Sequence, residues 1–373
     1  MTTHYGSMLR SGRQLLAGIF LGLLASSVHA DTIAATITTG TNPGAVAVNA
    51  ATNKIYVANF GSGNVTVIDG ATNATTTVTA GLNPFAIAVN PVSNKIYVAN
   101  INNNTVTVIN GVDNTTVTVT VGIAPYAVAV NAVTNKVYVA NNGAGTVSVI
   151  DGVSNVASAP ITVGTAPGAL AVNTVTNRIY VANYTSNNVS VINGATNGVI
   201  ASPATGTNPR AIAVNTVTNR IYVANNGSAN ATVIDGVSFT PTNIPTGSYP
   251  SAVAVNSVTN KIYVANNDTI GNVTVIDGAT NAPTTVPTGS FPNDVTVNTA
   301  SNKVFVANGA GDTVTIINGA SNTTTTLPAG TDPWAVAVNT STNKTYVANY
   351  NSGNVTGTTG TDITPTLMML LLD

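Results

Sequence analysis

A Tyr-Val-Ala-Asn string, with phenylalanine once in place of tyrosine, recurs every 41 or 42 residues along this 373-residue chain. This internal repeat limits the possible folds more than any other property of the sequence. A proline before a short Ala/Val segment and a closing Asp-Gly or Asn-Gly recur in step with it. The tyrosine occurs seven times and is replaced once by phenylalanine, at Tyr56, Tyr97, Tyr138, Tyr180, Tyr222, Tyr263, Phe305 and Tyr346.

Each repeat is predicted to contain four short strands. In the first repeat these are Ala45–Val48, Lys54–Ala58, Asn64–Ile68 and a Thr-rich segment around Ala74–Thr79. Residues typical of turns separate the segments, which indicates an antiparallel meander. We name the four strands of a repeat a, b, c and d in chain order.

Four strands in about 41 residues are typical of one blade of a β-propeller. We therefore expect an all-β β-propeller of eight four-stranded blades, with seven blades and a spare repeat as the alternative. Strand a is expected to be innermost, because its small alanines suit the taper of a blade toward the axis. The eighth repeat has a degraded strand c at Asn354–Thr356 and no clear strand d. The segment Thr32–Thr39 resembles strand d, so we expect this N-terminal strand to complete the last blade and close the ring.

Two strings of the first repeat, Lys54–Asn59 (KIYVAN) and Val65–Gly70 (VTVIDG), resemble the YVTN-type β-propeller repeat of bacterial and archaeal surface-layer and YncE-like proteins. The resemblance covers roughly residues 32–355. It departs from the family pattern at Ala58 and its equivalents, where threonine is usual, and in the broken eighth repeat. It implies the propeller fold but no particular activity, because the matching residues are strand and turn positions.

The two ends of the chain differ from the repeats. Arg10 and Arg13, the apolar run Leu15–Leu24 and the small residues before Asp31 predict a signal peptide over residues 1–30, and hence a periplasmic, extracellular or cell-surface protein. The alternative, a membrane anchor, would need roughly twenty apolar residues. We expect the propeller to span 31–356. The irregular tail 357–373 is consistent with a frayed end, a truncated product or the start of a lost segment.

Composition excludes several kinds of site. The chain has no cysteine and no glutamate, and its two histidines, His4 and His29, lie within the expected signal peptide. The remaining chain therefore has no Ser-His-Asp triad, no Cys nucleophile and no Cys/His zinc site. Its nine cations face twelve aspartates, and no basic patch indicates nucleic acid as a partner.

Successive loops of a meander alternate between two faces of the ring. The a–b and c–d turns form what we call the repeat face, which carries one lysine or arginine per blade: Lys54, Lys95, Lys136, Arg178, Arg220, Lys261, Lys303 and Lys344. It also carries Asp69 and its equivalents. A charged binding ring is one interpretation; we favour a repeated set of solvated ion pairs or turn caps that serves the fold.

The d–a and b–c loops form the opposite side, the mouth face, where the repeats disagree. The residue after each repeat proline should ring the mouth of the central channel, and in blade order these residues are Gly44, Phe85, Tyr126, Gly168, Arg210, Ser251, Asn293 and Trp334. Phe85, Tyr126 and Trp334 form an arc interrupted only by Gly44, opposite Arg210 and near Asn293 and Asp294. This predicts a ligand-binding mouth for a carbohydrate or a peptide. The alternative is that these aromatic residues only pack over the blade tops.

A metal site is a weaker hypothesis. Asp268, Asp294 and Asp312, together with loop carbonyls, could supply hard oxygen ligands for Ca²⁺, but their spacing matches no known calcium loop. No other cofactor is expected.

Three functions remain open from the sequence. The first is a secreted, non-catalytic binding or scaffold module for a cell-surface glycan or protein. The second is a propeller hydrolase or lactonase with an Asp/Asn-based divalent metal site, which resembles the activity of some related propellers. The third is a purely structural lattice component.

Overall fold

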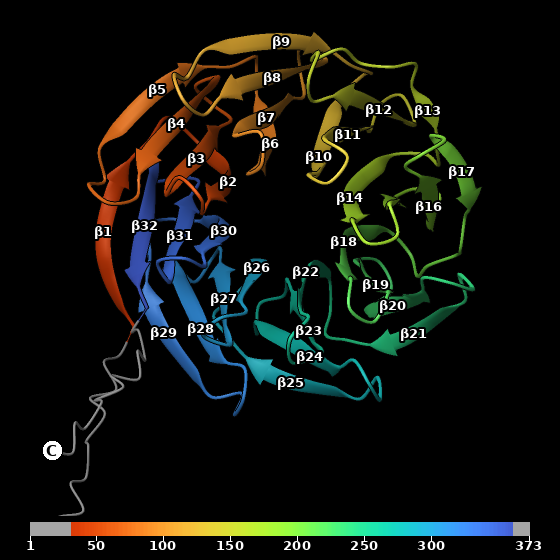
Figure 1. The fold of residues 1–373 in the computed structure, drawn as a ribbon. Helices are drawn as coiled ribbons and strands as arrows, with labels where there is room; N and C mark the ends of the chain where they lie inside the picture. Colours follow the sequence, from red (N-terminus) through yellow and green to blue (C-terminus); the bar gives the residue numbers. More distant parts are fainter. Residues whose placement is uncertain (1–30, 361–373) are drawn as a thin grey trace, which may run out of the picture.

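The structure is a computed structural model that describes residues 31–360. Eight four-stranded antiparallel sheets surround a central opening, so the chain is an eight-bladed β-propeller (Figure 1). The expected number of blades is confirmed, and the seven-bladed alternative is wrong. The expected signal peptide, 1–30, lies outside the described residues, as does the tail beyond residue 360.

The strands follow the expected order in every blade. The inner strands a are β2 (Pro43–Asn49), β6 (Pro84–Asn90), β10 (Pro125–Asn131), β14 (Pro167–Asn173), β18 (Pro209–Asn215), β22 (Pro250–Asn256), β26 (Pro292–Asn298) and β30 (Pro333–Asn339). Strands b are β3 (Lys54–Asn59), β7 (Lys95–Asn100), β11 (Lys136–Asn141), β15 (Arg178–Asn183), β19 (Arg220–Asn225), β23 (Lys261–Asn266), β27 (Lys303–Asn308) and β31 (Lys344–Asn349).

Strands c and d form the outer half of each blade. Strands c are β4 (Asn64–Asp69), β8 (Thr105–Asn110), β12 (Thr146–Asp151), β16 (Asn188–Asn193), β20 (Asn230–Asp235), β24 (Asn272–Asp277), β28 (Thr313–Asn318) and β32 (Asn354–Thr359). Strands d are β5 (Thr75–Thr79), β9 (Thr116–Thr120), β13 (Ile161–Thr162), β17 (Gly198–Ala201), β21 (Pro241–Pro245), β25 (Pro283–Pro287), β29 (Thr324–Pro328) and β1 (Thr32–Thr38).

The eighth blade takes its outer strand from the beginning of the described chain. Its strand order is β1-β32-β31-β30, and β1 pairs antiparallel with β32, with Ile37 opposite Val355. In Figure 1 the red-orange β1 runs beside the blue β32. Strand β32 extends to Thr359, three residues beyond the point where we expected the repeat pattern to stop.

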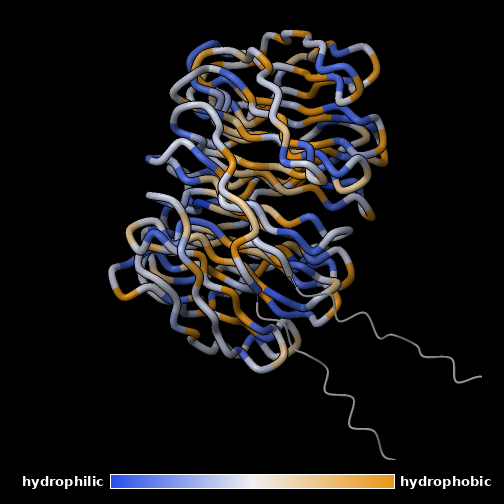
Figure 2. The backbone as a smooth tube through the Cα atoms, turned by 90° about the vertical axis from the view of Figure 1, so that its left-hand side faces the viewer, coloured by the Kyte–Doolittle hydropathy of each residue, from blue (hydrophilic) through white to orange (hydrophobic). Residues whose placement is uncertain are grey.

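The core lies between neighbouring blades, and the repeat tyrosine is at its centre. Tyr56 of the first blade is fully buried and packs with Ile96 and Val98 of the second. The same arrangement recurs around the ring, because b and c strands carry apolar residues on both faces and each blade is covered on both sides. Figure 2 shows the hydrophobic stretches running within the blades, with many of the turns hydrophilic.

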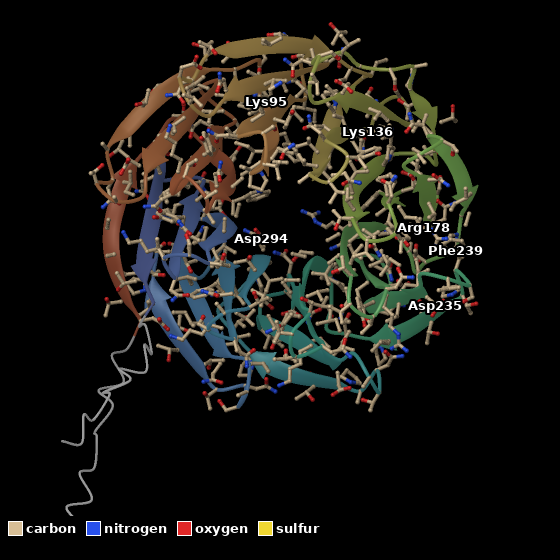
Figure 3. All side chains as sticks on the ribbon, in the orientation of Figure 1. Lys95, Lys136, Arg178, Asp235, Phe239 and Asp294 are labelled. Atoms are coloured by element: carbon tan, nitrogen blue, oxygen red, sulfur yellow. The ribbon has the colours of Figure 1, made fainter. Side chains whose placement is uncertain are left out.

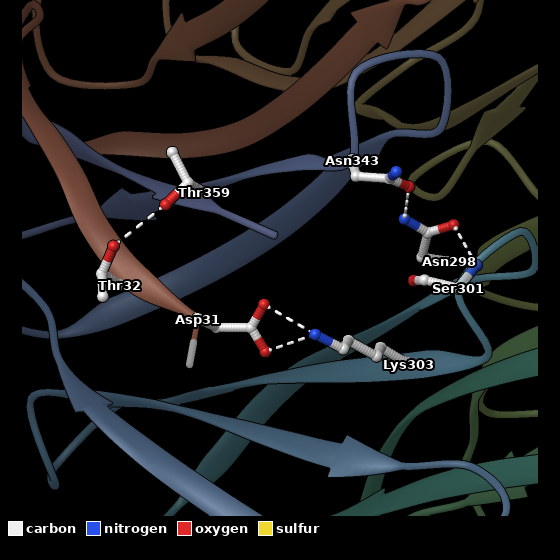
Figure 4. A network of polar contacts seen from close by, with 7 residues as sticks. All are labelled: Asp31, Thr32, Asn298, Ser301, Lys303, Asn343 and Thr359. Atoms are coloured by element: carbon white, nitrogen blue, oxygen red, sulfur yellow. Dashed lines mark hydrogen bonds and ion pairs between the residues drawn. The ribbon is translucent and has the colours of Figure 1, made fainter. Parts of the chain in front are cut away.

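A ring of asparagines joins the blades on the repeat face. The amide of Asn49, at the end of β2, donates to Asn94 Oδ1 in the next blade at 2.8 Å. The equivalent bond occurs between all eight pairs of blades, including Asn298 to Asn343 at 2.9 Å (Figure 4) and Asn339 back to Asn53 at 2.8 Å. These asparagines therefore hold the blades in a fixed angular relation.

Candidate functional site: the channel mouth

Most cations of the repeat face donate to the backbone of the next blade. In seven of the eight blades the lysine or arginine donates to the carbonyl of the turn glycine in the following blade. Lys54 Nζ, for example, lies 2.7 Å from Gly111 O. The expected solvated ion pairs are thus wrong for these seven blades, and the cations are half-buried clamps between blades.

The aspartates of the repeat face cap turns, as expected. Asp69 Oδ1 accepts hydrogen bonds from the backbone N–H groups of Ala71 and Thr72 and from the Thr72 hydroxyl. These bonds favour the ionised form and lower the pKa of Asp69 from its ordinary value. Asp151, Asp235 and Asp277 make the same kind of cap, so the repeat face is accounted for by the fold.

On the mouth face, the six candidate residues line one cavity at the axis. This mouth cavity has a volume of about 350 Å³, and small alanines of the inner strands form part of its wall. The candidate residues in its lining are Phe85, Tyr126, Arg210, Asn293, Asp294 and Trp334. Gly44 and Ser251 also line it. Blade order alone placed these residues together because each follows or lies next to a repeat proline.

The aromatic arc consists of two groups of packed rings, one on each side of Gly44. The ring centroids of Phe85 and Tyr126 are 4.2 Å apart, and Phe60 from a b–c loop packs edge-on against Phe85 at 6.3 Å. Trp334 stacks at 5.5 Å on Tyr350, whose ring lies 3.9 Å from the position that a Cβ on Gly44 would occupy. Tyr350 therefore covers the gap that Gly44 was expected to leave. Trp334 is 38% exposed, which leaves part of its indole accessible.

The polar side of the mouth connects blades six, seven and eight. Ser251 Oγ donates to Pro292 O at 2.8 Å, and Asn293 Nδ2 donates to Pro333 O at 3.0 Å. The sequence pattern places Asn293 among the ligand-binding groups and does not predict these bonds. Their sequence signal is a small polar residue where the other repeats carry glycine, an aromatic residue or arginine.

Asp294 also spans two blades. It replaces the alanine that the other seven repeats have at this position. Its Oδ2 accepts the backbone N–H of Val336 in the next blade at 2.9 Å, and its Oδ1 accepts the N–H of Val295 at 2.9 Å. Desolvation raises the pKa of Asp294 to about 6, although both hydrogen bonds act in the opposite direction. In Figure 3 Asp294 lies at the inner edge of the ring, far from Asp235.

Arg210 differs from every other cation among residues 31–360. It is exposed at the start of β18, and it makes no hydrogen bond or ion pair with any described residue, whereas the eight repeat cations are all bonded. Its neighbours around the mouth are Gly168, which has no side chain, and Ser251, which is buried. The guanidinium group is therefore free to reach a ligand.

A second cavity of about 410 Å³ adjoins the mouth cavity between blades seven and eight, and Asn293 and Trp334 line both. Asp312 and Asp332 line the second cavity; Asp312 Oδ1 accepts the backbone N–H of Asp332 at 2.8 Å. Desolvation and, secondarily, the charge of Asp312 raise the pKa of Asp332. Asp332 was not among the predicted site residues; it precedes a repeat proline at a position where three other blades have asparagine.

The three aspartates considered for Ca²⁺ do not form a cluster. Asp268 caps Gly271 N at 2.8 Å, Asp294 binds two inner strands, and Asp312 binds Asp332. Within 31–360, no three acidic side chains lie close enough together to hold a metal ion. The donor set of the mouth thus does not fit an all-carboxylate calcium site.

Comparison with known proteins identifies the fold class only. No family model matches the sequence, and no curated protein matches it. Among solved structures, the chain is similar to one titled Kuenenia stuttgartiensis Hydrazine Synthase, with a TM-score of 0.61 and 18% identity over 86% of this chain and 96% of that chain. This likeness supports the propeller fold and no function. In the described part of the chain, no helix is long and apolar enough to cross a membrane.

Proposed function

We propose that this chain is an exported, non-catalytic β-propeller that binds a cell-surface glycan or protein at its channel mouth. The observation that carries the proposal is the division between the two faces. The charged residues that recur in every blade are bonded within the ring, while the residues that differ between blades line one open cavity with an aromatic wall and an unbonded arginine. Such cavities with a few convergent polar groups are the usual sites of ligand binding.

Membership of the YVTN-type repeat proteins and export by a signal peptide are part of the same proposal. The strings at Lys54–Asn59 and Val65–Gly70 support the first, and the apolar run Leu15–Leu24 after two arginines supports the second. Fractionation of cells that express the full chain tests the second part. Recovery of the protein in the cytoplasm with residues 1–30 intact would contradict it.

The binding proposal is tested with a glycan array and with capture of surface proteins by the purified propeller. Trp334→Ala and the double variant Phe85→Ala, Tyr126→Ala should each reduce binding at least tenfold, since aromatic anchors contribute much of the binding energy in such sites. Thr116→Ala, at an exposed outer strand away from the mouth, is the control and should bind like the wild type. Equal binding by all variants would rule out the mouth as the site.

A hydrolase or lactonase is the second candidate. The raised pKa of Asp294 favours it, because a carboxyl group with a pKa near 6 can act as a general acid or base near neutral pH. The enzyme would need an Asp/Asn-based divalent metal site, and no three acidic side chains of residues 31–360 cluster to supply one from carboxylates alone. Stoichiometric metal in the purified protein together with lactone turnover that is lost in Asp294→Ala would establish the enzyme and overturn the binding module.

We also propose that the pairing of β1 with β32 closes the ring in the folded protein. Its support is a specific contact: both carboxylate oxygens of Asp31 lie 2.8 Å from Lys303 Nζ, so a residue preceding β1 supplies the acceptor that a turn glycine supplies in other blades (Figure 4). The Lys303 side chain is 22% exposed and the Asp31 side chain is 8% exposed. Asp31→Ala should lower the free energy of unfolding by about 1–3 kcal/mol, between values typical of exposed and buried pairs.

Deletion of residues 31–39 gives the sharper test of closure. Without β1, strand β32 becomes an exposed edge, and such edges pair with other chains. We expect a large loss of thermal stability and concentration-dependent association in analytical ultracentrifugation. A monomer of unchanged stability would contradict ring closure by this strand.

A further inference from the structure

We propose that the channel mouth recognises an acidic saccharide: a sugar ring that stacks on the aromatic wall and carries a carboxylate or sulfate group that pairs with Arg210. This inference rests on the proposed function and names the chemical class of its ligand. Its starting point is that Arg210 is exposed, lines the mouth cavity and has no partner among the described residues.

The unpaired guanidinium group of Arg210 indicates an anionic group in the ligand. Arginine presents a planar set of donors that pairs with carboxylate or sulfate oxygens through two parallel hydrogen bonds. The acidic residue in the lining of the same cavity, Asp294, already accepts two backbone N–H groups and bonds neither to Arg210 nor to another described cation. No described side chain therefore neutralises the guanidinium group, and a ligand anion can do so.

The opposite wall of the same cavity indicates a ring. Phe85 and Tyr126 form one aromatic surface, and the exposed part of Trp334 lies beyond the glycine that Tyr350 covers. Aromatic faces pack against the C–H faces of sugar rings, and the polar edges of Tyr and Trp tolerate the surrounding water. The wall and Arg210 come from blades on different sides of the axis, so one ligand must span the mouth to contact both.

A saccharide fits the rest of the lining better than a peptide terminus does. Asn293, which is partly buried, keeps capacity for a hydrogen bond with a sugar hydroxyl beside its bond to Pro333 O, and Ser251 and Asp294 add polar atoms to the lining. The alanines between them keep the cavity wide enough, at about 350 Å³, for a sugar unit entering from the open face. A peptide carboxylate bound alone would leave the aromatic wall unused.

Isothermal titration calorimetry of the chain without the expected signal peptide (31–373) tests the inference. The probes are tri-galacturonate, a mannuronate trimer, a hyaluronan tetrasaccharide and a chondroitin sulfate tetrasaccharide. Each is compared with a neutral counterpart, including the methyl ester of tri-galacturonate. At least one acidic probe should bind, and it should bind at least tenfold more tightly than its neutral counterpart. The reason is that the neutral counterpart cannot form the charge-assisted hydrogen bonds with Arg210. The sulfated and the purely carboxylated probes distinguish which anion is preferred.

Two variants test the role of Arg210. Arg210→Ala should weaken binding of the acidic probe at least tenfold and leave its neutral counterpart unchanged. The exchange variant Arg210→Gly, Gly168→Arg keeps the net charge but moves the cation one blade along the ring; a Cβ on Gly168 would meet only Ala166 O, at 3.9 Å. Specific pairing predicts that the exchange variant also loses the acidic probe. If the exchange variant binds the acidic probe like the wild type, general electrostatic attraction explains the binding and the proposed contact with Arg210 is wrong.

The outcomes separate this inference from the function on which it rests. Binding of a neutral glycan that depends on Trp334 but not on Arg210 would overturn the acidic ligand and keep the binding module. Arg210-dependent binding of a peptide with a free C-terminal carboxylate, and not of its amide, with no acidic saccharide bound, would overturn the saccharide. Failure of all glycans and surface proteins to bind would overturn both proposals.

Discussion

The two faces of the ring use the same repeated strands for different purposes. On the repeat face, an asparagine of each blade bonds to the next blade, and in seven of the eight blades a lysine or arginine donates to the turn glycine of the next blade. On the mouth face, the residue after the proline is different in nearly every blade, and one of these residues, Arg210, has no described partner. The comparison suggests that repetition marks the residues that hold blades together and variation marks those available for a ligand.

The largest expected effect distinguishes the faces with one type of substitution. A Cβ on Gly111 would lie 2.7 Å from Asn94 Cγ and 2.8 Å from Asn94 O, and backbone cannot easily retreat. Gly111→Ala should therefore lower the free energy of unfolding by about 2–3 kcal/mol, as in overpacked cores. On the mouth face, a Cβ on Gly168 would meet only Ala166 O, at 3.9 Å. Gly168→Ala should therefore change the free energy of unfolding by less than about 0.5 kcal/mol. Chemical denaturation measures both changes, and equal losses would show that the two faces do not differ in how tightly their glycines are packed.

A smaller loss is expected when a clamp of the repeat face is removed. Lys136 Nζ donates to Gly194 O at 3.0 Å, and Lys136→Met keeps most of the aliphatic stem while removing the donor. The free energy of unfolding should fall by about 1 kcal/mol, the usual net value of a hydrogen bond. Lys136→Arg, the residue type present at Arg178 and Arg220, should restore it. Full stability in the methionine variant would show that the clamp contributes nothing.

Asp294 is the mouth-face residue whose effect should depend on pH. Because its pKa in the folded state is about 6, above the ordinary value of 3.8, the folded protein binds this proton more tightly than the unfolded chain does. Its contribution to stability is therefore fully present below about pH 4 and is lost as the pH rises through 6. Asp294→Ala, with the alanine of the other blades, should flatten the dependence of melting temperature on pH between 4 and 7.

Two measurements check this prediction. The carboxyl carbon of Asp294 should titrate near pH 6 by NMR, well above Asp69, whose pKa is lowered. At pH 7 the alanine variant should be at least as stable as the wild type, since it removes a desolvated charge. A variant that is less stable at pH 7, with an unchanged pH profile, would mean that the bond to Val336 N outweighs desolvation.

The smallest expected effect on stability is that of Arg210→Ala. An exposed side chain with no described partner should change the free energy of unfolding by less than about 0.5 kcal/mol. The same variant is expected to bind acidic saccharides more weakly, so this substitution should affect binding without affecting the free energy of unfolding. A destabilisation of 1 kcal/mol or more would place Arg210 with the structural residues and remove the contrast between the faces.

Much of the architecture could be predicted from the sequence. The period of the tyrosine string determined the number of blades, and the turn residues determined the strands to within about one or two residues, since each blade is formed by local antiparallel pairing. The composition of the mouth was also predictable, because the arrangement of the blades around one axis brings the residues after the repeat prolines to the same side. The eighth blade was harder, since Gly357, Thr358 and Thr359 replace the usual pattern in a strand that nevertheless pairs to its end.

Only the tertiary structure decided which polar residues are engaged. Lys54 and Gly111 are 57 residues apart, and nothing in their spacing shows that an amine of one blade meets a carbonyl of the next. Asn293 and Asp294 resembled ligand-binding groups, but the angle between neighbouring blades brings them to the backbone of blade eight. Strand pairing within a blade is local and follows the sequence pattern, whereas contacts between blades depend on how the sheets pack. That packing left Arg210 alone, among the described cations, without a partner.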